Sequence, residues 1–180
     1  ALVATAGGRL EPDLKTAGGE LIRIPAASKN PITLIANAFK LAKIARERNV
    51  QIIHARSRAP AWSALLAARM ACVPFVTTYH GIYNAKSPLK TFYNSVMARG
   101  DAIIANSEFT LEHVLANHDV MPERVTAIPR GVDLDVFSPE KIAADDIAAL
   151  RVKWGVSSSQ CVILVPARLT RWKGQMVLIE

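Results

Sequence analysis

The stretch of sequence that decides the fold lies at residues 50–81 and reads VQIIHARSRAPAWSALLAARMACVPFVTTYHG. It starts with an apolar run at 50–55, continues as a nearly all-apolar segment from Pro60 to Ala71, and ends in a second short run at 74–78. Short runs rich in valine and isoleucine, separated by helical segments, are typical of parallel strands joined by crossover helices. Residues 50–81 therefore predict one strand–helix–strand unit, with Pro60 in the first turn of its helix.

The same alternation continues on both sides of this unit, which predicts an α/β fold with a doubly wound parallel sheet. Asn30, Ser87 and Ser107 each stand where they can cap the start of a helix. The helix after Asn30 is expected to bury one face, formed by Ile35, Ala38, Ala42 and Ala45. The predicted strands are Leu2–Ala6, Glu20–Ile24, Val50–Ala55, Pro74–Thr78, Asp101–Ala105, Arg124–Ile128 and Gln160–Val165.

Two features predict how the chain is divided into domains. The turn-rich segment 129–139 and the acidic helical stretch around Asp145 and Asp146 place a boundary near Ser138, giving domains at 1–137 and 138–180. The chain starts inside a predicted strand, and its last predicted strand is followed only by the beginning of a helix at Gly174. We therefore expect a fragment that lacks the first strand–helix unit and most of a second domain, and that transfers nothing on its own.

The positive charge of the chain is concentrated in one block. With 22 basic and 15 acidic residues the net charge is +7, and no acid occurs between Glu47 and Asp101. This pattern favours an anionic partner, namely a phosphorylated small molecule, an anionic membrane surface or nucleic acid, or it is only a solvated face. The cations of this basic block are Arg48, Arg56, Arg58, Arg69, Lys86, Lys90 and Arg99.

Composition and missing motifs exclude several classes of protein. Cys72 and Cys161 are far apart and no CxxC or Cys/His spacing occurs, which argues against a disulfide framework or zinc site and favours a reduced, cytoplasmic protein. The longest apolar stretch, 60–79, is too interrupted to span a membrane. The sequence has no GxGxxG, no GxxxxGK and no GxSxG, so neither a dinucleotide fingerprint, a P-loop nor a serine nucleophile elbow is expected.

Two polar segments follow predicted strands, where ligands bind in open α/β sheets. His80 and Gly81 come after the strand at 74–78, and His80 can donate a hydrogen bond to a sugar hydroxyl or a phosphate, unless it is a structural histidine. Arg56 and Arg58 follow the strand at 50–55 and can hold an anion, unless they are solvated loop arginines. His54 is expected to pack, and His113 and His118 to lie on a helix face.

A third polar segment lies near the end of the chain. Arg168 and Lys173 straddle the turn after the strand predicted at 160–165, and Gly174 leaves room for a ligand close to the backbone. Two cations at the start of a helix can bind a diphosphate and offset its charge without a metal. Asn106-Ser107, after the strand at 101–105, predicts no more than a helix cap.

At these residues the sequence resembles the retaining GT-B glycosyltransferases of family four, the group 1 type. The resemblance is carried by His80-Gly81, by the segments 101–107 and 128–133, and by Arg168 with Lys173-Gly174. The loops around Thr77–Tyr83 are most similar to lipopolysaccharide-core and lipid-linked mannosyl- or glucosyltransferases. The linker departs from the family pattern at Arg130, where asparagine is common.

This resemblance implies a two-domain enzyme that transfers a sugar from a nucleotide diphosphate sugar to a glycan or lipid-linked acceptor with retention. It implies that residues 1–137 bind the acceptor and that 138–180 begin the domain for the nucleotide sugar. Arg168, Lys173 and Gly174 would bind the donor diphosphate, His80 would touch the transferred sugar as the catalytic residue, and no cofactor or metal would be needed. A cytoplasmic enzyme of bacterial lipopolysaccharide or surface polysaccharide synthesis, docked on the inner face of the membrane, is then expected.

Two other functions remain open from the residues. A nucleotide-sugar epimerase shares the fold but needs further carboxylates. A basic nucleic-acid-binding module fits the charge block, although most aromatic residues there fall on predicted core elements and form no stacking surface. We therefore expect a nucleotide sugar, a glycan or lipid-linked acceptor and an anionic membrane surface as partners, and no nucleic acid.

Overall fold

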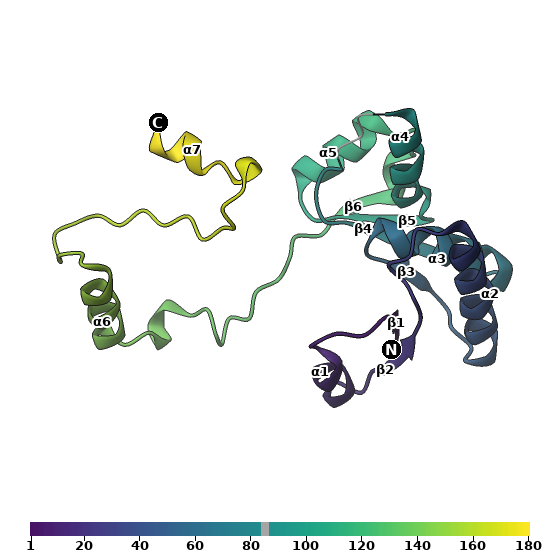
Figure 1. The fold of residues 1–180 in the computed structure, drawn as a ribbon, viewed down its shortest axis with the longest axis horizontal. Coiled ribbons are helices and arrows are strands. Elements are labelled where there is room, and N and C mark those ends of the chain that lie inside the picture. Colours follow the sequence, from purple (N-terminus) through teal and green to yellow (C-terminus); the bar gives the residue numbers. More distant parts are fainter. Residues whose placement is uncertain (84–86) are drawn as a thin grey trace. The chain divides into compact units, whose positions relative to one another are not determined.

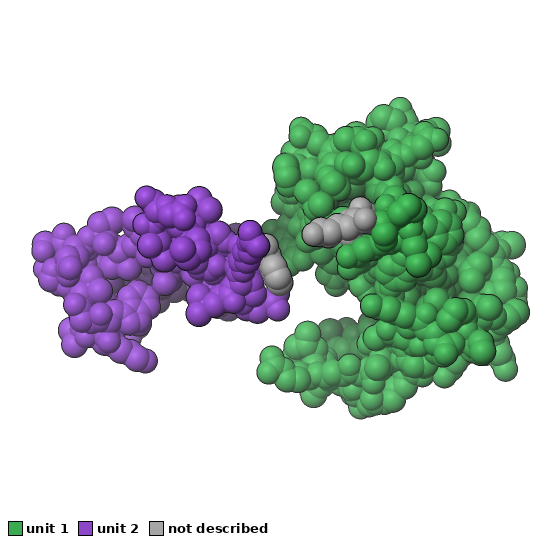
Figure 2. Space-filling view, turned by 45° about the horizontal axis from the view of Figure 1, so that its top comes forward, with its two compact units in different colours: residues 1–130 green, residues 131–180 purple. Residues whose placement is uncertain are grey.

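The computed structural model describes residues 1–83 and 87–180, without the side chain of Trp172, so Lys86 of the basic block lies outside the described residues. The chain divides into two compact units, unit 1 at Ala1–Arg130 and unit 2 at Gly131–Glu180 (Figure 2). The division falls within the turn-rich segment 129–139, and the boundary predicted near Ser138 lies inside unit 2.

The described residues of unit 1 form six parallel strands in two sheets. One sheet pairs β1 with β2, and the other has the order β3-β4-β5-β6, so that neighbours in the sheet are also neighbours in the sequence. The parallel α/β architecture predicted from the sequence is therefore confirmed. The strands are β1 (Leu2–Thr5), β2 (Glu20–Arg23), β3 (Ile53–Ala55), β4 (Phe75–Tyr79), β5 (Ala102–Ala105) and β6 (Val125–Ala127).

The helices of unit 1 that start at Pro31, Pro88 and Glu108 begin where the sequence provides side-chain caps. The Asn30 side chain accepts hydrogen bonds from the backbone of the first turn of α2, and Ser87 and Ser107 cap α4 and α5 in the same way. The helix predicted from Pro60 begins two residues earlier, at Arg58. The helices are α1 (Glu11–Thr16), α2 (Pro31–Glu47), α3 (Arg58–Ala71), α4 (Pro88–Asn94) and α5 (Glu108–Asn117), with 3-10 helices η1 (Ser95–Arg99) and η2 (Pro122–Arg124).

One face of the four-stranded sheet forms the core. Side chains alternate along a strand, so Phe75, Thr77 and Tyr79 of β4 share the face that is fully buried, together with Ile103 of β5. This face packs against α3, η1 and α5, while α2 lies beside α3 (Figure 1). On α2 the predicted buried face is correct for Ala38, Ala42 and Ala45 and wrong for Ile35, which is 51% exposed.

The opposite face of the same sheet carries His54 of β3 and Thr78 of β4, and the His54 Nε2 atom lies 2.8 Å from the Thr78 hydroxyl oxygen. Half-buried Val76 and Ile104 lie on this face too. Residues that extend these strands by an even number of positions are expected on this face as well. The residues directly after β3 and β4 are therefore expected on the face of the sheet opposite the apolar core.

Unit 2 contains helices but no strand among its described residues, so the strand predicted at Gln160–Val165 is wrong. Ile163 is 74% exposed and Leu164 62% exposed. A strand needs a neighbour that accepts and donates its backbone hydrogen bonds, and the described residues of unit 2 provide none here. The elements are η3 (Pro139–Lys141), α6 (Ala144–Trp154), η4 (Arg171–Lys173) and α7 (Gln175–Ile179).

Candidate functional site

The candidate site of unit 1 lies at the carboxyl edge of the four-stranded sheet. Arg56 follows β3 and His80 follows β4, and both extend their strands on the face that carries His54 and Thr78. Arg130 comes three positions after β6, and its guanidinium Nη2 lies 3.1 Å from His80 Nδ1. Because all four strands are parallel, their carboxyl ends meet at one edge, where open α/β sheets bind ligands.

The contact with Arg130 determines which nitrogen of His80 carries a proton. A guanidinium has five N–H donors and no acceptor, so Arg130 donates and His80 Nδ1 accepts. Neutral His80 then carries its proton on Nε2. No side chain among the residues described accepts a hydrogen bond from that atom, so it can donate one to a ligand hydroxyl or phosphate oxygen.

The surroundings of His80 favour its neutral form. Burial lowers the pKa of His80, and the positive charges of Arg56 and Arg130 lower that pKa further, with a smaller effect of His54. Burial also lowers the pKa of His54, again with Arg56 adding to the effect. The site thus combines a neutral histidine donor with two permanent cations.

The two arginines that the sequence grouped together differ in their surroundings. Arg58 is the first residue of α3, donates to Asn94 Oδ1 over 2.7 Å and lies 4.3 Å from the ring centre of Tyr83. Arg56 has no hydrogen bond or ion pair with any described residue. Arg56 is therefore the guanidinium available to a ligand, whereas Arg58 is occupied by its neighbours.

Gly81 allows the chain to turn sharply directly after His80. Its φ of +147° is a backbone conformation that residues with a side chain rarely adopt, and nothing lies within 4 Å of the position of a Cβ. Glycine is therefore required here by backbone geometry, and the space it leaves beside His80 is open.

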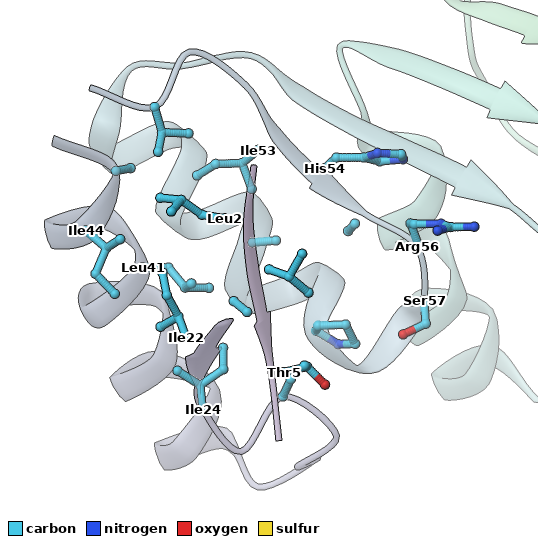
Figure 3. A pocket seen from close by; sticks show the side chains of 18 of the residues that line it. Leu2, Thr5, Ile22, Ile24, Leu41, Ile44, Ile53, His54, Arg56 and Ser57 are labelled. Carbon is cyan, nitrogen blue, oxygen red and sulfur yellow. The ribbon is translucent and has the colours of Figure 1, made fainter. Parts of the chain in front are cut away.

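A large groove adjoins the site on the other side of β3. Its volume is about 670 Å³, and it is lined by β1, β2, α2, β3 and α3. Figure 3 shows the apolar side chains of Leu2, Ile22 and Ile53 inside it, with Arg56 and Ser57 at the end of β3. The groove separates β1 from β3, which belong to different sheets.

A smaller pocket of about 320 Å³ lies between α4 and α5 and is mostly polar. The Tyr79 hydroxyl at its base lies 3.2 Å from His118 Nε2, and burial raises the pKa of that tyrosine. His118 therefore has a structural partner. The helix face predicted for both histidines is correct for His113 on α5 and wrong for His118, which follows the end of α5 in an extended conformation. The lining residues are Tyr79, Tyr83, Thr91, Asn94, His113, Asn117 and His118.

The residues predicted to bind a diphosphate lie in unit 2. Arg168 precedes the turn, and its backbone oxygen accepts from the Gln175 side chain over 3.0 Å. Lys173 ends η4, and Gly174 follows with φ +75°, a left-handed conformation suited to glycine. The Arg168 and Lys173 side chains are exposed and make no hydrogen bond or ion pair with the described residues. α7 has only five residues, which is too short for its N-terminus to count as an anion site. Arg168 and Lys173 are therefore the groups here that can bind a diphosphate.

The described residues provide neither a cluster of metal ligands nor a helix suited to span a membrane. Across 1–83 and 87–180, no three histidine, cysteine or acidic side chains gather where they could hold a metal ion. No helix in the same ranges is long and apolar enough to cross a membrane.

Sequence reasoning missed the role of Arg130 in this site. In the sequence, Arg130 stands out only as a departure from the linker pattern. The contact joins residues 50 positions apart, and nothing in their spacing indicates it. The available signal was that both residues follow predicted strands of one parallel sheet, which brings them to the same edge.

Several solved structures are similar to this chain in fold. A glycosyltransferase from Rickettsia africae is 37% identical, with a TM-score of 0.81, and the match covers 99% of this chain and 47% of that one. Anabaena HepE in complex with UDP-glucose is 23% identical, with a TM-score of 0.74 over 99% of this chain and 48% of its own, which shows similarity of fold.

Two curated relatives of this chain have glycosyltransferase names. The chain is 26% identical to a putative glycosyltransferase, EpsF, of Bacillus subtilis, over 94% of this chain and 45% of the relative. It is 25% identical to D-inositol 3-phosphate glycosyltransferase 1 of Catenulispora acidiphila, over 97% of this chain and 45% of the relative. The chain therefore spans about half the length of the relatives it matches.

The model of the family described as Glycosyltransferase Family 4 matches residues 1–136, which is most of the chain and includes every residue of the site in unit 1. The Rickettsia africae glycosyltransferase and Anabaena HepE match this chain in fold across nearly its whole length. This chain belongs to glycosyltransferase family 4 and has the α/β architecture of the GT-B glycosyltransferases.

Proposed function

We propose that this chain is part of a retaining glycosyltransferase that moves a sugar from a nucleoside diphosphate sugar to a glycan or lipid-linked acceptor. The observation that carries the proposal is His80, which lies at the carboxyl edge of the sheet near the cations Arg56 and Arg130 and has an Nε2 donor that no described side chain accepts from. The Anabaena relative in complex with UDP-glucose supports a nucleotide sugar as the donor. Membership of the family favours transfer over epimerisation and over nucleic-acid binding.

Each group then has a chemical task. The acceptor hydroxyl attacks the anomeric carbon from the face on which the phosphate departs, the bond to the phosphate oxygen breaks, and that oxygen takes the hydroxyl proton. His80 Nε2–H donates to a hydroxyl of the transferred sugar and fixes its orientation. Arg168 and Lys173 offset the charge that develops on the departing diphosphate, so that the chemistry requires neither a metal nor a covalent nucleophile.

The acceptor side of the proposal uses unit 1. Arg56 and the open backbone at Gly81 lie beside His80 and would hold a polar or anionic group of the acceptor. Arg58 is a weaker candidate because Asn94 and Tyr83 already contact its guanidinium.

We also propose that unit 1 docks on an anionic membrane, as a lipid-linked acceptor of lipopolysaccharide or surface polysaccharide synthesis would require. On α4, Leu89 is 79% exposed and Phe92 57% exposed, beside the exposed cation Lys90. Phe92 stacks on Trp62 at 5.2 Å, and the Arg99 guanidinium lies over both rings. Aromatic and cationic groups together are suited to the headgroup region of a bilayer.

The donor assignment is tested with Arg168→Ala and Lys173→Ala in the complete protein. A hydrogen bond to a charged group is worth about 1.5 to 3 kcal/mol, so each variant should lose roughly ten- to a hundredfold in kcat/KM for the nucleotide sugar. The KM for the acceptor should not change. Lys153→Ala removes the same charge from α6 and is the matched control. Unchanged donor dependence in both variants would reject the assignment.

A further inference from the structure

The contact between Arg130 and His80 does more than add a charge to the site. Arg130 is the last residue of unit 1 and is exposed, and its side chain has His80 as its hydrogen-bond partner among the described residues. An exposed arginine normally remains solvated, because fixing a long side chain costs conformational entropy. A guanidinium that is held 3.1 Å from an imidazole nitrogen therefore calls for a functional reason.

The geometry allows only one protonation state of the histidine. Arginine is always a donor, so Nδ1 must present its lone pair to Nη2. A proton on Nδ1 would place two N–H groups against each other, and protonation of both nitrogens would also add a third positive charge beside Arg56 and Arg130. The arrangement thus selects neutral imidazole with its proton on Nε2.

We propose that Arg130 is a positioning residue that holds His80 as the neutral Nε2–H tautomer and fixes the direction in which that N–H donates. This proposal rests on the proposed role of His80 in orienting the transferred sugar. Without Arg130, His80 could rotate, change tautomer or take up a proton, and in each case the donor facing the sugar would be lost or misdirected.

The other groups that act on His80 do not replace this effect. Arg56 and His54 follow or belong to β3 and influence the charge of the ring, but neither forms a hydrogen bond with it. His54 directs its own Nε2 to the Thr78 hydroxyl. Only Arg130, from the segment after β6, contacts a ring nitrogen among the described residues, so removal of Arg130 affects both the tautomer and the charge state.

The direct experiment is a pH titration of the histidine rings by NMR, with ¹⁵N-labelled protein and His80→Ala to assign the His80 signals. In the wild type, the ring ¹⁵N shifts should identify Nε2 as the protonated nitrogen of neutral His80. In Arg130→Ala the midpoint of the His80 titration should move to higher pH. Arg130→Lys keeps a charged donor and should restore the wild-type tautomer. Lys29→Ala removes an exposed cation from the loop before α2, which is not among the groups that shift the pKa of His80, and should change neither.

The kinetic experiment separates a positioning role from a structural one. In the complete protein, Arg130→Ala should lower kcat/KM about tenfold at mildly acidic pH and less at alkaline pH, where His80 is neutral in both proteins. The melting temperature should stay unchanged, and Arg130→Lys should recover activity.

Two results would overturn the proposal: a proton on Nδ1 in the wild type, or the same His80 titration in Arg130→Ala as in the wild type. The NMR result does not depend on transferase activity. A protein that shows the predicted tautomer but no sugar transfer would contradict the proposed function and leave the role of Arg130 intact. A protein that transfers sugar but carries its His80 proton on Nδ1 would contradict the role of Arg130 and leave the proposed function intact.

Discussion

Residues 75–79 and residues 161–165, FVTTY and CVILV, are two short runs that are each rich in β-branched residues, and only the first forms a strand. The second run is the more apolar, with Ile163 and Leu164 mostly exposed, whereas Phe75 and Tyr79 are fully buried. β4 has β3 on one side and β5 on the other, and α3 and η1 cover its buried face. An apolar or β-branched run therefore becomes a strand only where neighbouring strands pair with its backbone hydrogen-bonding groups.

The largest difference in stability is expected between the variants Phe75→Ala and Leu164→Ala. Truncation of a fully buried phenylalanine leaves a cavity and should cost about 3 to 5 kcal/mol, which lowers Tm by about 10 °C or more. In the 180-residue chain the leucine is 62% exposed, and its truncation there should change the stability by less than about 0.5 kcal/mol. Thermal unfolding by circular dichroism measures both, and equal losses would show that residues 161–165 have a core of their own.

The exposed apolar residues of unit 1 should behave differently from those of unit 2, because α4 combines them with cations. Each cation near an anionic bilayer contributes about 1 kcal/mol, so the charge reversal Lys90→Glu should weaken binding to anionic vesicles about tenfold or more at low salt. Lys29→Glu makes the same change at an exposed site outside the proposed docking surface and is the control. Sedimentation with anionic and with neutral vesicles gives the measurement, and equal partitioning to both would remove the membrane proposal.

A smaller effect on stability is expected from Asp101, which directly precedes β5 and links it to β4. The Asp101 carboxylate accepts from the Phe75 backbone N–H over 2.8 Å and from Arg69 over 3.1 Å. The hydrogen bond from Phe75, followed by Arg69, lowers the pKa of Asp101 despite the opposing effect of burial. Asp101→Asn should therefore cost about 1 kcal/mol at neutral pH, since the site is partly exposed and screened.

The pH dependence of that loss follows from the direction of the shift. A carboxyl with a lowered pKa stabilises the folded state above its unfolded pKa, and this contribution disappears as the pH falls through the folded value. The difference in Tm between wild type and Asp101→Asn should begin to shrink near the ordinary pKa of 3.8 and vanish below the lowered one. A difference that stays constant from pH 7 to pH 2 would contradict the role of the carboxylate.

The sequence was sufficient to predict the strands of unit 1 and its helices from α2 to α5, because local signals agree there, whereas α1, which begins without a side-chain cap, was not predicted. The caps at Asn30, Ser87 and Ser107 begin the helices, and the valine- and isoleucine-rich runs form the parallel strands. The prediction at 160–165 failed because it used the same signal without a neighbouring strand. Local composition therefore predicts which segments are able to form strands, and tertiary pairing decides which of them do.

The candidate site could be predicted only in part. The sequence indicated His80, Gly81 and Arg56 because each follows a strand, and the structure places them at one edge of the sheet. It could not distinguish Arg56 from Arg58, since that difference depends on where Asn94 and Tyr83 lie in three dimensions. The assignment of Arg168, Lys173 and Gly174 to the donor stays a prediction, as do the roles of the residues in unit 1.

The role of His80 in the site is tested most directly by the turnover of His80→Ala in the complete protein with a nucleotide sugar donor, measured together with the Tm of the variant. His80 touches the sugar in this account and contributes no buried core contact, so turnover should fall roughly ten- to a hundredfold while Tm changes by no more than about 2 °C. Wild-type turnover in the variant, or a loss explained by a large fall in Tm, would contradict a site built around this histidine.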